Sequence, residues 1–215
     1  PGASGTWANF DLYELVVYNA RLTPAEAQAV AAALADGWAI PEIGNQLILE
    51  GDSITQGTGA VTSGLNPAMI LTEPGAGRIP ATWRVLNQGV SGNQVPNLVS
   101  RRDTALSWAT QLLPGQNVMA VEIGRNDMVG SGGNLTAAQH YANVVAYLNT
   151  ATTGVLQRGW TVRLLANIAG PAAFNASHIN PYRAMVRNPQ FLADTATGSG
   201  QAFAGRLGIV DTDLI

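Results

Sequence analysis

The chain has 215 residues, 47% of them hydrophobic and 12% charged, a composition that fits one compact domain with an appendage and excludes a disordered chain. A net charge of −3 and arginines that are scattered, apart from the Arg101–Arg102 pair, argue against nucleic acid as a partner. The absence of cysteine excludes thiolate nucleophiles and cysteine-ligated metals, and two histidines are too few for a three-histidine zinc site.

Lysine is absent as well, so Schiff-base chemistry is excluded and the glycine-rich stretch 57–64 cannot be a Walker A loop. We therefore expect no metal and no cofactor. No apolar run approaches the roughly 18 residues of a membrane span, so none is expected. The first residues, PGASGTW, contain neither an initiator methionine nor a signal peptide, which suggests a piece of a longer protein.

The N-terminal segment predicts one strand and one helix. Residues 10–19 are rich in β-formers on both faces, as in a strand of a sandwich. Thr23 is a suitable N-cap, Pro24 suits the first helical position, Glu26 completes a capping box and Gly37 can end the helix. We expect one face of this helix to carry Val30, Ala31, Leu34 and Trp38.

A lone strand with a helix cannot bury its own core. The wording ELVVYN, followed by LTPAEAQAVAAALADGW, resembles the closing strand and helix of concanavalin-like (laminin G-like) domains. Residues 1–43 are therefore expected to be the C-terminal remnant of such a β-sandwich. The alternative is an N-terminal arm that docks on the following domain.

Residues 44–215 predict an α/β domain. Five apolar runs indicate a parallel sheet, at 46–50, 83–87, 117–123, 161–168 and 208–211. Helical periodicity is seen between them, at 96–113, at 135–151 and from near Pro181. Right-handed crossovers would place helices on both faces of the sheet. The glycine- and proline-rich stretch 56–82 is expected to be a loop.

Polar segments follow the first three strands, at the edge where open α/β sheets bind ligands. They read GDSIT from Gly51, NQGVSG from Asn87 and GRND from Gly124. Acyl transfer requires a nucleophilic hydroxyl beside preorganised donors for an oxyanion. Ser53 can supply the hydroxyl and a backbone donor, Gly92 lets its N–H approach closely, and Asn126 offers an amide NH2.

These three blocks, in this order, resemble those of the SGNH (GDSL-type) hydrolases. The resemblance covers residues 46–215 and implies a flavodoxin-like, three-layer α/β/α fold without a metal. It also implies that Ser53 is the nucleophile of an acyl-enzyme mechanism, and that Gly92 and Asn126 complete the oxyanion hole.

The fourth block of that family, an Asp-x-x-His segment near the C-terminus, is missing, because no histidine follows Asp211 or Asp213. A serine without a base is a weak nucleophile. The favoured explanation is truncation, with Asp213 in the register of the acid and Asp211 structural or facing a ligand. The alternatives are that His178 is the base, or that the domain has lost catalysis. His140 is expected on a helix surface.

Six residues in or beside these segments allow other interpretations. Asp52 is expected to cap a helix, and Asn126 with Asp127 can be a strand-end turn. Glu50 and Glu122 end buried strands, and a glycosidase built on this pair is disfavoured because it leaves the serine and glycine loops unexplained. Arg125 reaches the substrate or is only solvated.

The function predicted is a serine esterase that hydrolyses carboxylic esters, with small-molecule or carbohydrate esters as substrates. A carbohydrate-binding type of neighbour would suit removal of O-acetyl groups from glycans by a secreted or cell-surface enzyme. The alternative is an inactive SGNH-like domain that acts as a glycan-binding module.

Overall fold

The computed structural model describes residues 23–37, 44–58, 79–80, 82–104, 107–129, 133–166, 172–195 and 205–211. The chain divides into two compact units, residues 1–42 and 43–215, and each is described by itself. No helix in the described part of the chain is long and apolar enough to cross a membrane.

The described part of the first unit is helix α1 (Pro24–Gly37). Its N-terminus has the predicted capping box: Thr23 donates its N–H and its hydroxyl to Glu26 Oε2 at 2.8 and 2.7 Å, and Glu26 N–H donates to Thr23 Oγ1 at 3.3 Å. The helix ends at Gly37, as predicted. The predicted strand 10–19 lies outside the described residues, as do the side chains of Ala31, Leu34 and Trp38 on the predicted apolar face; Val30 of that face is partly buried.

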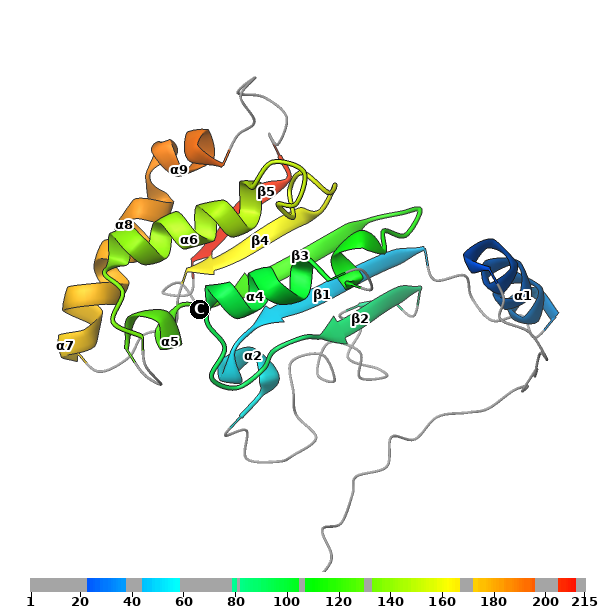
Figure 1. Ribbon diagram of the computed structural model, residues 1–215, viewed down its shortest axis with the longest axis horizontal. Coiled ribbons are helices and arrows are strands. Elements are labelled where there is room, and N and C mark those ends of the chain that lie inside the picture. Colours follow the sequence, from blue (N-terminus) through cyan, green and yellow to red (C-terminus); the bar gives the residue numbers. More distant parts are fainter. Residues whose placement is uncertain are drawn as a thin grey trace, which may run out of the picture. The chain divides into compact units, whose positions relative to one another are not determined.

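The second unit is built on a five-stranded parallel sheet (Figure 1). Its strands are β1 (Asn45–Gly51), β2 (Trp83–Asn87), β3 (Asn117–Glu122), β4 (Thr161–Ala166) and β5 (Leu207–Asp211). All five predicted strands are confirmed, with ends that differ by at most two residues. The spatial order β2-β1-β3-β4-β5 is that of flavodoxin-like folds, which confirms the predicted fold class.

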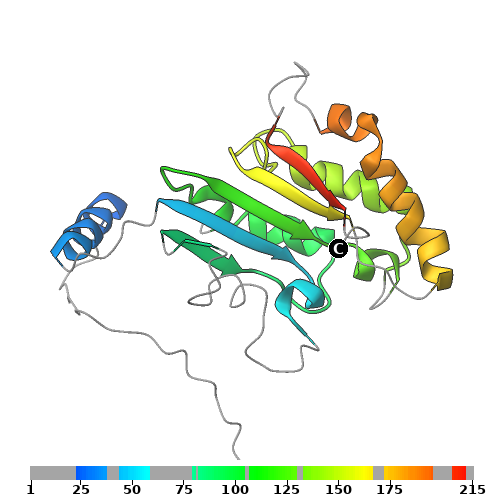
Figure 2. The same ribbon diagram turned by 180° about the vertical axis from the view of Figure 1, so that it is seen from behind.

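Three longer helical segments pack on this sheet: α4 (Val95–Arg102), α6 (Ala137–Asn149) and α8 (Asn180–Arg187). Figures 1 and 2 show α4 and α6 over the same face, and α8 contacts α6. In β4, Val162, Leu164 and Ala166 are buried while the alternate residues are partly exposed, as expected for a strand with two different faces. The described helices thus account for one of the two predicted helical layers.

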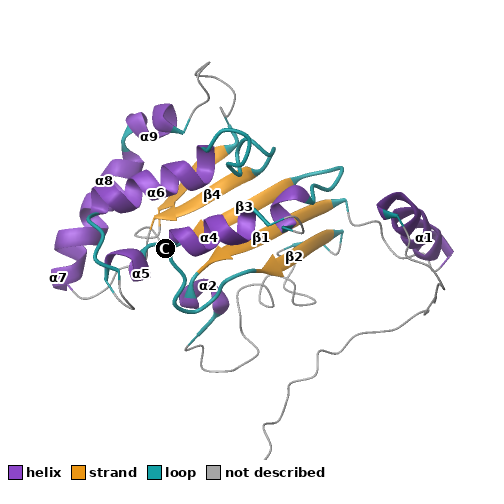
Figure 3. Cartoon of the chain, viewed as in Figure 1, coloured by secondary structure: helices purple, strands orange, loops and turns teal. Residues whose placement is uncertain are grey.

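Shorter helical pieces complete the described elements. They are α2 (Ser53–Gln56), η1 (Trp108–Thr110), α5 (Arg125–Met128), α7 (Ala172–Phe174), the π-helical turn η2 (Asn175–Ile179) and α9 (Pro189–Asp194). Figure 3 shows α2 beside the arrowhead of β1, and α7, η2 and α8 follow one another without a break.

Two predicted helices have different bounds. The helix predicted over 96–113 ends at Arg102, because Asp103 leaves the helical path and Ser107 caps the separate turn η1 through Ala109 N–H. The helix predicted from Pro181 begins earlier, at Ala172, because Pro181 is accommodated at the N-terminus of α8 while the preceding π-helical turn continues the helix.

The core lies between the sheet and the helices. Ile48, Met119, Val121, Val162 and Leu164 are fully buried strand residues. They meet buried side chains of α4, α6 and α8, namely Leu98, Val144, Tyr147, Leu148 and Tyr182. Burial of this kind stabilises the fold by roughly 25 cal/mol per Å² of apolar surface.

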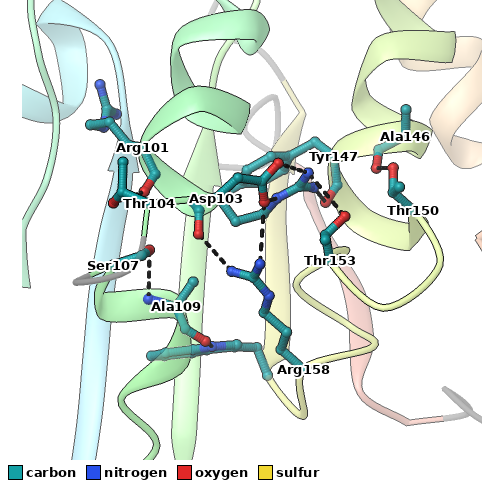
Figure 4. Close-up of polar contacts among 12 residues, drawn as sticks. Arg101, Asp103, Thr104, Ser107, Ala109, Ala146, Tyr147, Thr150, Thr153 and Arg158 are labelled. Atoms are coloured by element: carbon teal, nitrogen blue, oxygen red, sulfur yellow. Dashed lines mark hydrogen bonds and ion pairs between the residues drawn. The ribbon is translucent and has the colours of Figure 1, made fainter.

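A buried arginine ties the end of α4 to the rest of the core. Arg102 donates to both carboxylate oxygens of Asp103 at 2.7 and 2.8 Å and to the Tyr147 carbonyl oxygen at 2.7 Å. Arg158 donates to the Arg102 carbonyl oxygen at 2.6 Å and to Asp103 at 3.2 Å, and Figure 4 shows Arg158 pointing to Asp103. The hydrogen bond from Arg102 lowers the pKa of Asp103. This network joins α4, α6 and the turn before β4.

Candidate active site

The serine of the first polar segment stands at the carboxyl end of β1. Asp52 caps α2, accepting a 2.9 Å hydrogen bond from Ile54 N–H through Oδ1, as predicted. Ser53 is therefore the first residue of α2, and its side chain is partly exposed. Neither its hydroxyl nor its N–H bonds to another described residue. A hydroxyl placed in this way is accessible to a ligand.

The second polar segment packs directly on α2. Asn87 donates to the Thr55 carbonyl oxygen at 2.7 Å, and Ser91 N–H donates to Gln56 Oε1 at 2.8 Å. Gly89 is required by this approach, because a Cβ there would lie 2.4 Å from Gln56 N. The loop after β2 is therefore held against the helix that carries Ser53.

Gly92 occupies the tip of the second segment. Its φ of +81° lies in the left-handed region, which favours glycine, and a Cβ there would meet no atom within 4 Å. The left-handed backbone conformation, rather than a lack of space for a side chain, thus explains why position 92 is a glycine. Its N–H donates to no other described residue, so it is free to bind an oxyanion.

The third segment connects the first two. Asn126 Nδ2 lies 3.0 Å from the Asn93 carbonyl oxygen and 3.4 Å from Asp52 Oδ2. Gln94 Nε2 donates to the Asn126 carbonyl oxygen at 2.8 Å. The bond to Asn93 fixes the amide, while the longer contact to Asp52 is weak enough for a substrate oxygen to replace it.

The structure thus brings together the neighbourhoods of Ser53, Gly92 and Asn126. The Asn126 amide touches the residue directly before Ser53 and the residue directly after Gly92. This arrangement agrees with the convergence predicted from the ends of parallel strands. Three donors, Ser53 N–H, Gly92 N–H and Asn126 Nδ2, are available at one edge of the sheet.

Asp127 stabilises this arrangement from the interior of the protein. It is 1% exposed, and its Oδ1 accepts a 3.0 Å hydrogen bond from Val95 N–H, the first residue of α4. Its Oδ2 lies 3.9 Å from His140 Nδ1. Burial raises the pKa of Asp127 to about 6. Asp127 therefore links α5 to α4, the two helices that flank the Gly92 loop.

The prediction that His140 lies on a helix surface is wrong. His140 is fully buried, and its ring makes an edge contact with Tyr182 at 4.6 Å between centroids. Burial lowers its pKa to about 4, so it is neutral at pH 7. The reason is its position in α6, three residues after buried Ala137 and four before buried Val144, on the face that meets the core.

Glu50 is a second buried acid beside the site. It forms an ion pair with Arg101, which also donates to Asn93 and, at 3.2 Å, to the Gln88 carbonyl oxygen. Burial raises the pKa of Glu50 to about 7, although Arg101 opposes the shift. The Glu50 carboxylate is thus held in a structural ion pair with Arg101. A glycosidase site that uses this carboxylate therefore stays disfavoured.

His178 lies in the π-helical turn η2. Its Nδ1 is 2.5 Å from Ser177 Oγ, and its ring stacks on Phe174 at 5.2 Å between centroids. These are its contacts with the described residues, and none of them involves Ser53. The described contacts of this candidate base thus show no hydrogen bond to the serine.

Among the described residues, no group of three histidine, aspartate or glutamate side chains is arranged to hold a metal ion. The stretch 56–82, predicted to be a loop, and Asp213 lie largely or wholly outside the described residues.

Three residues of the site were missed in the sequence: Asn93, Gln94 and Val95, which receive or form the bonds that hold Asn126 and Asp127. They directly follow Gly92, but each of the three bonds has a backbone group on one side, whose partners no residue type reveals.

Comparison with known proteins identifies solved structures with the same fold. No protein-family model matches the chain, and no curated protein sequence does. Among solved structures, a member of the lipolytic protein G-D-S-L family from Veillonella parvula DSM 2008 is similar at 14% identity and a TM-score of 0.53, over 77% of this chain and 76% of that one. The lipase/acylhydrolase from Enterococcus faecalis is similar at 16% identity and a TM-score of 0.50, over 78% and 75%. The chain has the fold of these two proteins.

Proposed function

We propose that this domain is a serine hydrolase of carboxylic esters, in which Ser53 forms the acyl-enzyme. The observation that supports this most is the Asn126 amide, which contacts both the Asp52 carboxylate beside Ser53 and the Asn93 carbonyl oxygen beside Gly92. The names of the two structures of the same fold, a lipolytic family member and a lipase/acylhydrolase, agree with an ester substrate.

In the proposed reaction, Ser53 Oγ attacks the ester carbonyl carbon as a base takes its proton, and the carbonyl oxygen becomes an oxyanion. Ser53 N–H, Gly92 N–H and Asn126 Nδ2 would donate to that oxygen. The C–O bond to the alcohol then breaks and the alcohol leaves with the proton. Water attacks the acyl-enzyme by the same route, releasing the acid and free Ser53.

The base is a histidine that experiment has to identify. His178 contacts Ser177 and Phe174. We favour a histidine supplied near the C-terminal end of β5, on the same edge of the sheet as Ser53. For the alcohol we propose a carbohydrate, with an O-acetyl group as the ester, and action outside the cell.

A second candidate function is a noncatalytic module that binds glycan esters. One observation favours it: no described titratable side chain forms a hydrogen bond with the Ser53 hydroxyl. The same open donors could then hold a ligand oxygen without chemistry.

The deciding experiment measures hydrolysis of p-nitrophenyl acetate by four proteins: this chain, its Ser53→Ala and His178→Ala variants, and a form that includes any native residues after Ile215. Activity that requires Ser53 and appears only in the longer form supports the proposal with a C-terminal base. Ser53-dependent activity in this chain that is lost in His178→Ala assigns the base to His178. No activity in any form favours the binding module.

A further inference from the structure

One arginine differs from the others that the structure describes. The described residues include nine of the eleven arginines. Eight of them interact with other parts of the protein: Arg84, Arg101, Arg102, Arg158, Arg163, Arg183, Arg187 and Arg206. The guanidinium group of Arg125 forms no hydrogen bond or ion pair with any described residue. Its guanidinium group is therefore not engaged in holding the described part of the fold.

Arg125 is also placed at the site. It is the first residue of α5 and directly precedes Asn126. Arg125 is exposed, Asn126 is partly exposed and Asp127 is buried, so α5 presents the cation to solvent and the carboxylate to the interior. A ligand oxygen held by the Asn126 amide would lie within reach of the arginine side chain.

The positive charge of Arg125 affects the pKa of a carboxyl group inside the site. Burial raises the pKa of Asp52, while the Ile54 N–H hydrogen bond and the positive charge of Arg125 lower it. Asp52 is the residue that caps the helix of Ser53. Arg125 is thus electrostatically connected to the serine loop as well as to the Asn126 loop.

The other charges of the three loops point away from solvent. Within residues 52–58, 88–94 and 124–129, all of which are described, the charged side chains are Asp52, Arg125 and Asp127. Both aspartates are buried, so Arg125 is the exposed charged side chain of this rim. A ligand entering over the three loops meets one cation and no exposed anion on them.

We propose that Arg125 determines specificity by binding an anionic group, a carboxylate, on the ester substrate next to the scissile carbonyl. This inference rests on the proposed esterase function and names its substrate class as acidic esters. A guanidinium group binds a carboxylate through two parallel N–H···O hydrogen bonds, which makes it selective as well as strong. For the O-acetyl ester proposed above, the carboxylate belongs to the alcohol part; the test also covers a carboxylate on the acyl part.

The test uses matched substrate pairs on the form that is active in the p-nitrophenyl acetate assay. For the acyl part, mono-p-nitrophenyl succinate is compared with p-nitrophenyl butyrate. For the alcohol part, 4-acetoxybenzoate is compared with 4-acetoxybenzamide. In one of these pairs we expect Arg125→Gln to lower kcat/KM for the acidic ester by about 10-fold, mainly through KM, with less than about a twofold change for the neutral ester.

Two variants serve as controls. Arg125→Lys keeps the charge without the fork and should restore part of the preference. Arg187→Gln removes another exposed arginine, on α8, and should leave both ratios unchanged. Equal losses on the acidic and neutral esters of both pairs in Arg125→Gln would overturn the proposal, since the arginine would then act on the transition state or on folding.

A binding measurement separates this inference from the catalytic one. The Ser53→Ala variant is titrated with the same four esters, and the backbone amide signals of Gly92 and Asn126 are followed by NMR. Tighter binding of an acidic ester than of its neutral partner, lost when Arg125→Gln is added, supports the inference even in a protein without activity. Equal affinities within both pairs contradict it, whatever the hydrolysis assay shows.

Discussion

The Arg102 network differs from the Ser53 rim, formed by residues 52–58, 88–94 and 124–129, in how its hydrogen-bond donors are paired. Arg102 is 2% exposed and donates to a carboxylate and a backbone carbonyl oxygen. At the rim, by contrast, the N–H groups of Ser53 and Gly92 have no described partner. A buried donor without a partner would cost stability, whereas an exposed donor on a fixed backbone is ready for a ligand. Paired donors indicate structure, and open donors on rigid loops indicate function.

The largest effect expected is on activity at the rim. Asn126→Ala should lower kcat by about 100 to 1000-fold with little change in KM, because the amide acts on the transition state. The free energy of unfolding should change far less. Steady-state kinetics and urea unfolding measure the two quantities, and Asn149→Ala, which removes an amide at the end of α6, is the matched control. A loss seen in KM alone would contradict an oxyanion role.

The next effect concerns Glu50, which lies between the two regions. Its folded-state pKa is raised from 4.5 to about 7, so between these values the folded chain holds a proton that the unfolded chain has released. The free energy of unfolding therefore falls as the pH rises through this window, by on the order of 3 kcal/mol in total. Glu50→Gln stays neutral and can still accept from Arg101, so its stability relative to the wild type should increase between pH 5 and pH 8.

Other groups titrate nearby but are present in both proteins. Asp127 acts in the same direction as Glu50 between its ordinary pKa of 3.8 and about 6. His140, lowered from 6.5 to about 4, acts in the opposite direction, because the unfolded chain binds the proton first as the pH falls. Urea unfolding at several pH values isolates Glu50 as the difference between wild type and variant. A difference that does not vary with pH would mean that Glu50 does not titrate in this range.

A smaller effect should follow from breaking the paired region. Arg102→Met keeps apolar contact with Tyr147 but leaves its carbonyl oxygen without the arginine, and should lower the free energy of unfolding by about 2 kcal/mol. Since Asp103 is exposed, little of this comes from its charge. Arg187→Met, on an exposed side chain, should change stability by less than about 0.5 kcal/mol. Thermal and urea unfolding measure both changes. If Arg102→Met and Arg187→Met lowered the free energy of unfolding equally, the structural distinction between the two arginines would be lost.

The smallest effect is the difference between two glycines of the same loop. Gly92→Ala should cost about 1 kcal/mol, because the strain is only that of a left-handed φ and the space is open. Gly89→Ala should cost more, about 1 to 3 kcal/mol, because its Cβ would lie 2.4 Å from backbone atom Gln56 N. Both can be measured by urea unfolding. The reverse order would show that the loop moves away from α2 more easily than the contacts suggest.

The sequence predicted the five strands and the meeting of Ser53, Gly92 and Asn126, since parallel strands place their carboxyl ends at one edge whatever their order. It also contained the signal for His140, whose spacing from Ala137 and Val144 is that of the buried face. The bond from Val95 N–H to Asp127 could not be predicted, because it joins residues 32 positions apart through a backbone group. Backbone donors carry no residue-specific signature.

The π-helical turn before α8 has a consequence for comparing this protein with its relatives. Phe174 and Ile179 are five residues apart and both buried, although in an α-helix that spacing would separate them by roughly 140°. The wider turn brings both onto one side, and Tyr182 and Val186 then continue at the usual spacing of three and four. A relative with a regular helix here would lack one residue. An alignment that leaves out this one-residue gap would pair Phe174 with a residue from the solvent side.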